Sequence, residues 1–195
     1  MTTVTPPREP PVFNLPNQLT AARFVLGIVL FVLIELGGLW EWCIVVFALA
    51  SVTDWLDGYL ARLQNLVSTL GRNLDPLVDK VVVSGAYIFL LPVQNSGLTA
   101  WMVTVVVARE MVITGLRSFL ENRGATFGAD LLGKIKMVLQ CAVLFAIFIS
   151  LEYPDEPALG TLRDSLIYAM LLATALSGAQ YLWRAASLLK VDLAS

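Results

Sequence analysis

Long apolar runs constrain the fold more than any other feature of this sequence. The run Ser165–Trp183 contains no charged residue, and about 20 consecutive apolar residues are enough for an α-helix to cross a bilayer. Hydrophobic residues make up 57% of the 195-residue chain and charged residues only 14%, whereas soluble domains carry roughly 25% charged residues. The sequence therefore predicts a membrane protein.

Apolar runs separated by turn-forming residues predict an all-α integral membrane protein with six transmembrane helices in one bundle. The expected spans, each placed to within a few residues, are 20–34, 42–64, 74–91, 98–121, 132–151 and 162–189. Residues 14–195 are expected to form a single domain. Residues 1–13, "MTTVTPPREPPVF", lack the basic-then-apolar order of a secretory signal and are predicted to be a disordered polar tail.

The basic residues predict the orientation in the membrane. If the N-terminus is cytoplasmic, all of the 13 Lys and Arg residues except Arg163 fall at cytoplasmic helix ends. Cytoplasmic loops of membrane proteins carry an excess of Lys and Arg, so both termini are expected in the cytoplasm. The net charge of −2 gives no basic footprint for nucleic acid, and no nucleic-acid partner is expected.

The chain contains no histidine, which excludes Ser-His-Asp catalysis and metal ligation by imidazole. Its two cysteines, Cys43 and Cys141, both lie in apolar helical runs. We expect them to be buried as small hydrophobic residues rather than joined in a disulfide or bound to a metal.

Four aspartates occur inside predicted membrane helices, where each costs roughly 2.5–3.5 kcal/mol at the helix centre. In the second helix, five residues at positions i, i+3, i+4, i+7 and i+8 lie on one face and form a stripe: Asp54, Asp57, Gly58, Ala61 and Arg62. In the third helix the spacing i, i+4 and i+8 forms another, made of Gly71, Asp75 and Asp79. A short turn joins the two helices, so we expect the stripes to face each other near the cytoplasmic boundary.

A divalent cation would explain why so much negative charge is gathered on two stripes. Carboxylate-only ligation suits Mg²⁺ or Mn²⁺, and the small residues beside the acids leave room for a phosphate-bearing ligand. One alternative is a polar seam of salt bridges with Arg62, Arg72 and Lys80. Another is a cation pathway, as in a divalent-cation transporter, but between residues 81 and 91 only Ser84 and Tyr87 are polar.

The pattern Asp54-x2-Asp57-Gly58-x2-Ala61-Arg62-x8-Gly71-x3-Asp75-x3-Asp79 resembles the signature of the CDP-alcohol phosphotransferases, also called CDP-alcohol phosphatidyltransferases. The resemblance implies a membrane enzyme, usually a homodimer, that transfers a phosphatidyl group from a CDP-linked lipid to an alcohol and releases CMP. It implies that Asp54, Asp57 and Asp75 bind two divalent ions, that Asp79 shares this site and is the general base, and that Asp57, Gly58, Ala61, Arg62 and Gly71 line the CDP site. Without an evident nucleophile in the chain, direct displacement is expected.

At the start of the first helix, Asn17, Thr20 and Arg23 fall on nearly one face. They are expected either to cap and anchor the helix at the interface or to contribute to the nucleotide or headgroup pocket. We include Asn17 and Thr20 among the candidate CDP-binding residues.

A group of basic residues bears on the acceptor: Arg109 and Arg117 in the fourth helix, and Lys134 and Lys136 at the start of the fifth. Each alone could be an anchor at the membrane surface. Together they suit an acceptor that carries its own phosphate, because a neutral alcohol gives no reason for the cluster.

The segments "NLPNQLTAAR", "ARE…TGLR" and "GK-K" resemble the phosphatidylglycerophosphate synthase branch of the family, although Met137 stands where that branch usually has a small polar residue. The resemblance implies CDP-diacylglycerol as donor, sn-glycerol 3-phosphate as acceptor and membrane lipids as surroundings. A phosphatidylinositol phosphate synthase, a cardiolipin synthase and an inactive scaffold remain alternatives. The charge pattern favours a bacterial inner membrane, with an organelle membrane as the alternative, and the active site is expected to face the cytoplasm.

Overall fold

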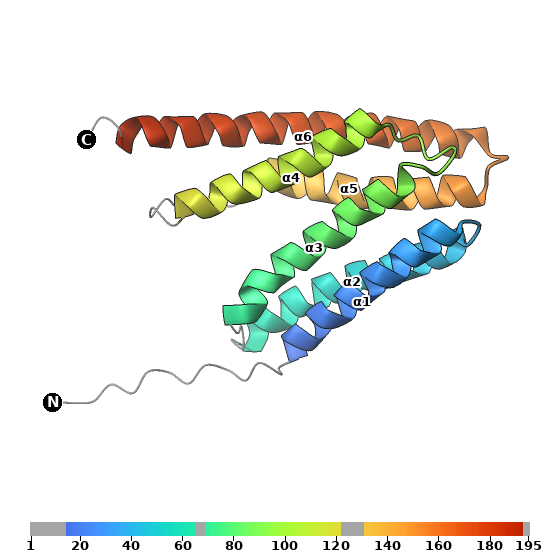
Figure 1. Ribbon diagram of the computed structural model, residues 1–195, viewed down its shortest axis with the longest axis horizontal. Coiled ribbons are helices and arrows are strands. Elements are labelled where there is room, and N and C mark those ends of the chain that lie inside the picture. Colours follow the sequence, from blue (N-terminus) through green and yellow to red (C-terminus); the bar gives the residue numbers. More distant parts are fainter. Residues whose placement is uncertain (1–14, 65–68, 122–130, 193–195) are drawn as a thin grey trace. The chain divides into compact units, whose positions relative to one another are not determined.

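A computed structural model describes residues 15–64, 69–121 and 131–192, with side chains left undescribed at 15–17, 54–64, 69–76, 119–121, 184 and 187–192. This part of the chain is entirely helical apart from its turns (Figure 1). The helices are α1 (Leu15–Leu36), α2 (Trp40–Gln64), α3 (Thr69–Leu90), α4 (Ala100–Glu121), α5 (Leu131–Glu152) and α6 (Pro157–Asp192). The all-α prediction is confirmed there, while the predicted N-terminal tail lies outside the described residues.

Three helices begin about five residues earlier than predicted, at Leu15, Thr69 and Pro157. The apolar pattern marks the part of a helix that is suited to lipid, whereas the helical backbone continues into polar sequence. Pro157 was predicted to lie in a loop, but proline is favourable in the first turn of a helix, where its missing N–H has no partner to lose.

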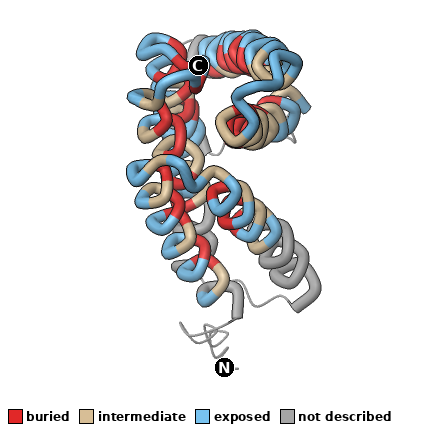
Figure 2. Tube along the Cα trace, turned by 90° about the vertical axis from the view of Figure 1, so that its right-hand side faces the viewer, coloured by how far each residue is buried: buried red, intermediate tan, exposed pale blue. Residues whose placement is uncertain are grey.

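Within the described residues, three helical stretches are long and apolar enough to cross a membrane: Gln18–Leu36, Leu131–Glu152 and Pro157–Trp183. Large apolar side chains also cover the outer faces of the helices, as Val25, Ile28 and Val32 do on α1. Figure 2 shows exposed residues interspersed with buried ones along the described parts of the helices. Exposed apolar surface on this scale is expected to face lipid, so the chain is a membrane protein.

The chain divides into two compact units, residues 1–85 and 86–195. In the first unit, α1 and α2 form a tightly packed hairpin (Figure 1). Gly37 and Gly38 join them with φ angles of 68° and 69°, a left-handed conformation that glycine adopts without strain. The core of the hairpin is apolar and includes Leu30, Ile34, Phe47 and the thiol-bearing Cys43, which is buried and free.

Helix α3 packs on α1 through two glycines. A Cβ atom at Gly27 would lie 2.5 Å from Val82 Cγ2, and one at Gly85 would collide with the Phe31 ring. Position 27 therefore lies beside position 82, and position 31 beside position 85, so α1 and α3 run parallel. Small residues let membrane helices approach this closely.

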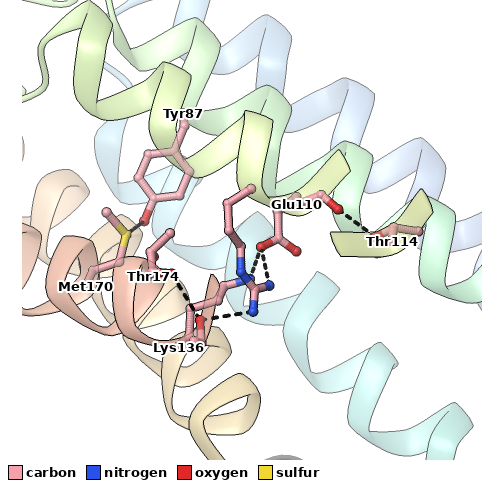
Figure 3. Close-up of polar contacts among 8 residues, drawn as sticks. Tyr87, Glu110, Thr114, Lys136, Met170 and Thr174 are labelled. Atoms are coloured by element: carbon pink, nitrogen blue, oxygen red, sulfur yellow. Dashed lines mark hydrogen bonds and ion pairs between the residues drawn. The ribbon is translucent and has the colours of Figure 1, made fainter. Parts of the chain in front are cut away.

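In the second unit, α5 and α6 form an antiparallel hairpin and α4 packs on α6 (Figure 1). Tyr87, near the end of α3, is completely buried in this unit. Its hydroxyl donates to the carbonyl of Gln140, 2.9 Å away, and lies 3.0 Å from Met170 Sδ (Figure 3). Within this unit, Tyr87 thereby ties the last turn of α3 to α5 and α6. Cys141 is half-buried and is not part of a disulfide.

Arg163, the exception to the charge pattern, has a structural role in the second unit. It donates to the carbonyl of Asn95 and, at 2.9 Å, to Oδ1 of Asp164. Asn95 and Gly97 form the turn between α3 and α4 and have φ angles of 61° and 75°. Arg163 therefore fastens this turn to α6, which explains a basic residue at this end of the helices.

Candidate functional site

The acidic stripe of α2 continues the buried face of that helix. Cys43, Phe47 and Ala50 are buried, and the helical repeat of 3.6 residues carries the same face on to positions 54, 57 and 61. The side chains of residues 54–64, which include Asp54, Asp57, Gly58, Ala61 and Arg62, lie outside the described residues. The helical register that the stripe requires is confirmed, and the meeting of the carboxylates stays a prediction.

The acidic stripe of α3 continues the face that packs on α1. Val82 and Gly85 contact α1, and the same face passes through positions 71, 75 and 79. Asp79 is half-buried, while the side chains at Gly71 and Asp75 are not described. The segment joining Gln64 to Thr69 can span at most about 18 Å, so the acid-bearing ends of α2 and α3 are neighbours.

The buried face of α1 carries polar residues at the same level. Thr20 is 5% exposed and Arg23 only 1%. Because α1 and α3 are parallel with Gly27 beside Val82, Arg23 is level with position 79 and Thr20 with position 75. The prediction that Thr20 and Arg23 share a face is confirmed, and the side chain of Asn17 lies outside the described residues.

The residues of the first unit fit a divalent metal by the chemistry of their donors. A buried guanidinium is costly unless negative charge lies close by, and Arg23 is level with the aspartates of α3. Carboxylate oxygens are the donors that Mg²⁺ and Mn²⁺ prefer. Among the side chains that the structure describes, no three potential ligands come together, but of the four aspartates only Asp79 belongs to that set.

The second unit contains a buried ionic cluster whose charged residues come from two helices, α4 and α5 (Figure 3). Glu110 of α4 accepts through Oε1 from Lys136 Nζ of α5 and, at 3.1 Å, from Arg109 Nη1. The side chains of Lys136, Glu110 and Arg109 are 5%, 11% and 13% exposed. We call Arg109 and Lys136 the cation pair. Both were predicted to bind the acceptor, and the structure brings them together on one carboxylate oxygen.

Helix α6 holds Arg109 in place. Arg109 Nη2 donates to Ser177 Oγ at 3.0 Å. The Arg109 side chain passes close to Gly178, where an added Cβ atom would lie 3.5 Å from Arg109 Cγ. The guanidinium lies 5.8 Å from the centre of the Tyr181 ring. Sequence reasoning missed these residues and Glu110. Their signal was weak: small and polar residues at helical spacing in an otherwise apolar helix.

Three buried polar atoms in the described part of the second unit have no hydrogen-bond partner: Arg109 Nε, Gln140 Nε2 and Thr174 Oγ1. Gln140 follows Lys136 by one turn of α5, and Thr174 precedes Ser177 by one turn of α6. A buried polar group without a partner costs about 1–3 kcal/mol. Among the described residues, the cluster therefore has hydrogen-bonding capacity left for a ligand.

The other two predicted acceptor-binding residues lie elsewhere on the same helices. Lys134 is exposed and sits about 200° around α5 from Lys136, because each residue turns the helix by about 100°. Arg117 is exposed on α4, two turns beyond Arg109. Of the four predicted cations, the described contacts join only the cation pair.

A helical membrane protein with cations buried in its interior is suited to binding anionic groups. The profile of the CDP-alcohol phosphatidyltransferase family matches residues 13–186, and the chain belongs to this family. The match includes all six helices and extends well into α6. Membership also means that a divalent metal ion takes part in the chemistry.

Among the relatives is the CDP-diacylglycerol–glycerol-3-phosphate 3-phosphatidyltransferase of Bacillus subtilis, 38% identical over 87% of this chain and 93% of its own. The enzyme of the same name from Rickettsia typhi is 34% identical over 86% of this chain and 94% of its own. The enzyme of the same name from Sodalis glossinidius is 30% identical over 88% of this chain and 94% of its own.

Proposed function

We propose that this chain is a phosphatidylglycerophosphate synthase, which transfers the phosphatidyl group of CDP-diacylglycerol to sn-glycerol 3-phosphate and releases CMP. The activity for which its relatives are named supports this assignment. The observation that carries it is the buried cation pair on Glu110. A phosphorylated acceptor needs such cations, whereas a neutral alcohol does not.

The donor half of the reaction is assigned to the first unit. Asp54, Asp57, Asp75 and Asp79 would hold two Mg²⁺ ions, with Mn²⁺ as the alternative, and these ions would neutralise the diphosphate and the charge on departing CMP. CDP binding would fall to two groups of residues. Those on the acidic stripes of α2 and α3 are Asp57, Gly58, Ala61, Arg62 and Gly71, and those on the polar face of α1 are Asn17 and Thr20.

Asp79 would act as the general base. Its carboxylate takes the proton of the acceptor hydroxyl while the hydroxyl oxygen attacks the phosphorus that bears diacylglycerol. A phosphorus–oxygen bond to the acceptor forms, the bond to the oxygen that bridges the two phosphates breaks, and CMP leaves with that oxygen. The chain has no histidine, and direct displacement needs no covalent enzyme intermediate.

The acceptor half is assigned to the basic residues of the second unit. Arg109 and Lys136 would bind the phosphate of glycerol 3-phosphate through charge-assisted hydrogen bonds. Arg117 and Lys134, which lie elsewhere on α4 and α5, would contribute longer-range positive charge. The cation pair is buried and held by α4, α5 and α6, so its geometry is set before the acceptor arrives.

The proposal includes a membrane topology and an assembly. The six helices would each span the membrane as one domain, with both termini and the active site on the cytoplasmic side of a bacterial inner membrane. The asymmetry of the basic residues supports this orientation, as does the bacterial origin of the relatives. A homodimer follows from the family resemblance.

An acceptor assay tests the proposal. Purified protein in detergent receives CDP-diacylglycerol and Mg²⁺ with glycerol 3-phosphate, inositol phosphate or phosphatidylglycerol as acceptor, and CMP release is measured. We expect release with glycerol 3-phosphate, its loss on chelation, and its recovery with Mg²⁺ or Mn²⁺. Release with inositol phosphate but not with glycerol 3-phosphate would contradict the proposal. Metal flux into liposomes without any nucleotide lipid would instead favour a transporter.

A further inference from the structure

Glu110 is a buried acid for which the proposed reaction has no use. It does not belong to the aspartate stripes, yet it is buried in the second unit with both members of the cation pair on its Oε1. Adjacent residues on a helix point about 100° apart and do not normally face each other. The contact between Arg109 and Glu110 therefore arises because α6 holds the Arg109 side chain.

Stability alone is a poor reason for this cluster. Replacing a buried ionic triad by apolar residues is often neutral or stabilising, because desolvating the charges costs as much as their attraction returns. In a membrane protein, buried ionisable residues are functional by default. The described contacts join two cations and one anion, and this excess of positive charge suits the cluster to attract an anion.

The shared oxygen sets the distance between the two cations. Two nitrogen atoms that donate to one oxygen lie at most about 6 Å apart, because each hydrogen bond is about 3 Å long. At this spacing both can bind oxygens of a single phosphate group. Arg109 Nε is buried without an acceptor in the described part of the chain, and a phosphate oxygen would be an acceptor of the right kind.

We propose that Glu110 is the positioning residue of the acceptor-phosphate site. Its carboxylate holds Arg109 and Lys136 together and charged, so that they bind the phosphate as a pair, while Glu110 itself does not contact the reacting atoms. This inference rests on the proposed function, which assigns the acceptor phosphate to the cation pair. Without the carboxylate the two cations repel each other and separate, and the site is lost even though both cations remain.

The test is the Glu110→Gln variant, which keeps the side-chain shape and removes the charge. We expect the KM for glycerol 3-phosphate to rise about tenfold to a hundredfold, as for loss of a charge-assisted hydrogen bond. The KM for CDP-diacylglycerol and kcat should stay within about twofold, and Glu110→Asp should restore part of the affinity. The matched control is Glu152→Gln, which lies at the opposite end of α5 from Lys136. This variant should leave both KM values unchanged.

A double-mutant cycle separates positioning from general stabilisation. If Glu110 acts through Lys136, Glu110→Gln should add little to the KM increase of Lys136→Ala. Fully additive increases, an unchanged or lower acceptor KM in Glu110→Gln, or equal increases for both substrates would overturn the inference.

A direct binding measurement keeps this test independent of the proposed function. Calorimetry with inorganic phosphate compares the wild type and Glu110→Gln without any donor lipid. Weaker phosphate binding by the variant supports the inference, and equal or tighter binding overturns it. Absence of CMP release from the wild type with glycerol 3-phosphate would reject the proposed function but leave this comparison intact.

Discussion

Arg23, Glu110 and Lys136 are charged side chains folded into the interior of their units. Each is within a helix whose other buried positions are largely apolar. A lone charge in such surroundings is expensive, so each of these residues marks a place where opposite charge is concentrated. For Lys136 the opposite charge is Glu110. For Arg23, the aspartates of α3 lie at the same height along the parallel helices α1 and α3 and can supply the opposite charge.

Exchange of individual aspartates should separate the two roles assigned to them. We expect Asp79→Asn to lower kcat by about a hundredfold or more, because the acceptor hydroxyl loses its proton acceptor, while CDP-diacylglycerol binding is largely kept. Asp57→Ala should instead raise both the donor KM and the Mg²⁺ concentration needed for half-maximal activity. Steady-state kinetics over a range of Mg²⁺ concentrations measures both effects. Near wild-type turnover by Asp79→Asn would show that Asp79 is not the general base.

The contact between α1 and α3 depends on two glycines that have no room for a side chain. It sets the register that brings the polar face of α1 level with the acidic stripe of α3. Gly115 of α4 is different, because a Cβ atom there meets nothing within 4 Å. The two kinds of glycine should therefore respond differently to the same substitution.

We expect Gly27→Ala to destabilise the protein by about 1–3 kcal/mol, the usual effect of overpacking a core. Val82→Ala in the same chain should recover part of the loss, because it removes the methyl group that the new Cβ would strike. Gly115→Ala is the control and should be neutral or stabilising by up to about 1 kcal/mol. Thermal unfolding in detergent compares these three variants with the wild type. Equal melting temperatures for Gly27→Ala and the wild type would show that the helices can move apart freely.

At the scale of the whole molecule, charge and turn structure bear on orientation in the membrane. The turns at 37–39, 91–99 and 153–156 contain no Lys or Arg. Arg163 of α6 donates a hydrogen bond to the carbonyl of Asn95 in the second of these turns. Lys80 and Arg109 lie near the middles of α3 and α4, and the other basic residues fall toward the opposite helix ends in a six-span topology. This asymmetry predicts which segments face the cytoplasm.

Cysteine labelling in intact bacterial cells checks this topology. In a background with Cys43→Ala and Cys141→Ala, we expect Gln94→Cys and Asp155→Cys to react with a membrane-impermeant maleimide in cells whose outer membrane has been permeabilised. Thr2→Cys and Ser195→Cys should react only after the inner membrane is opened as well. Reaction of Thr2→Cys with a sealed inner membrane, or protection of Gln94→Cys, would mean that the orientation is inverted or that the number of spans is not six.

Local sequence determined the helices and the faces of the acidic stripes. An apolar run long enough to span a bilayer predicts a helix from its own residues, and positions 54, 57 and 61 share a face of any α-helix that contains them. The same reasoning predicted that Thr20 and Arg23 share a face on α1. Helix ends were less certain, because polar residues and Pro157 can continue a helix beyond its apolar part.

Only the tertiary structure decided which polar residues meet. Sequence spacing grouped Lys134 with Lys136, but packing buries Lys136 on Glu110 and leaves Lys134 exposed. Neighbours on a helix such as Arg109 and Glu110 are not expected to pair, and Ser177 lies 68 residues from Arg109 in the chain. Contacts of this kind depend on how whole helices pack, and no local pattern of residues contains that information.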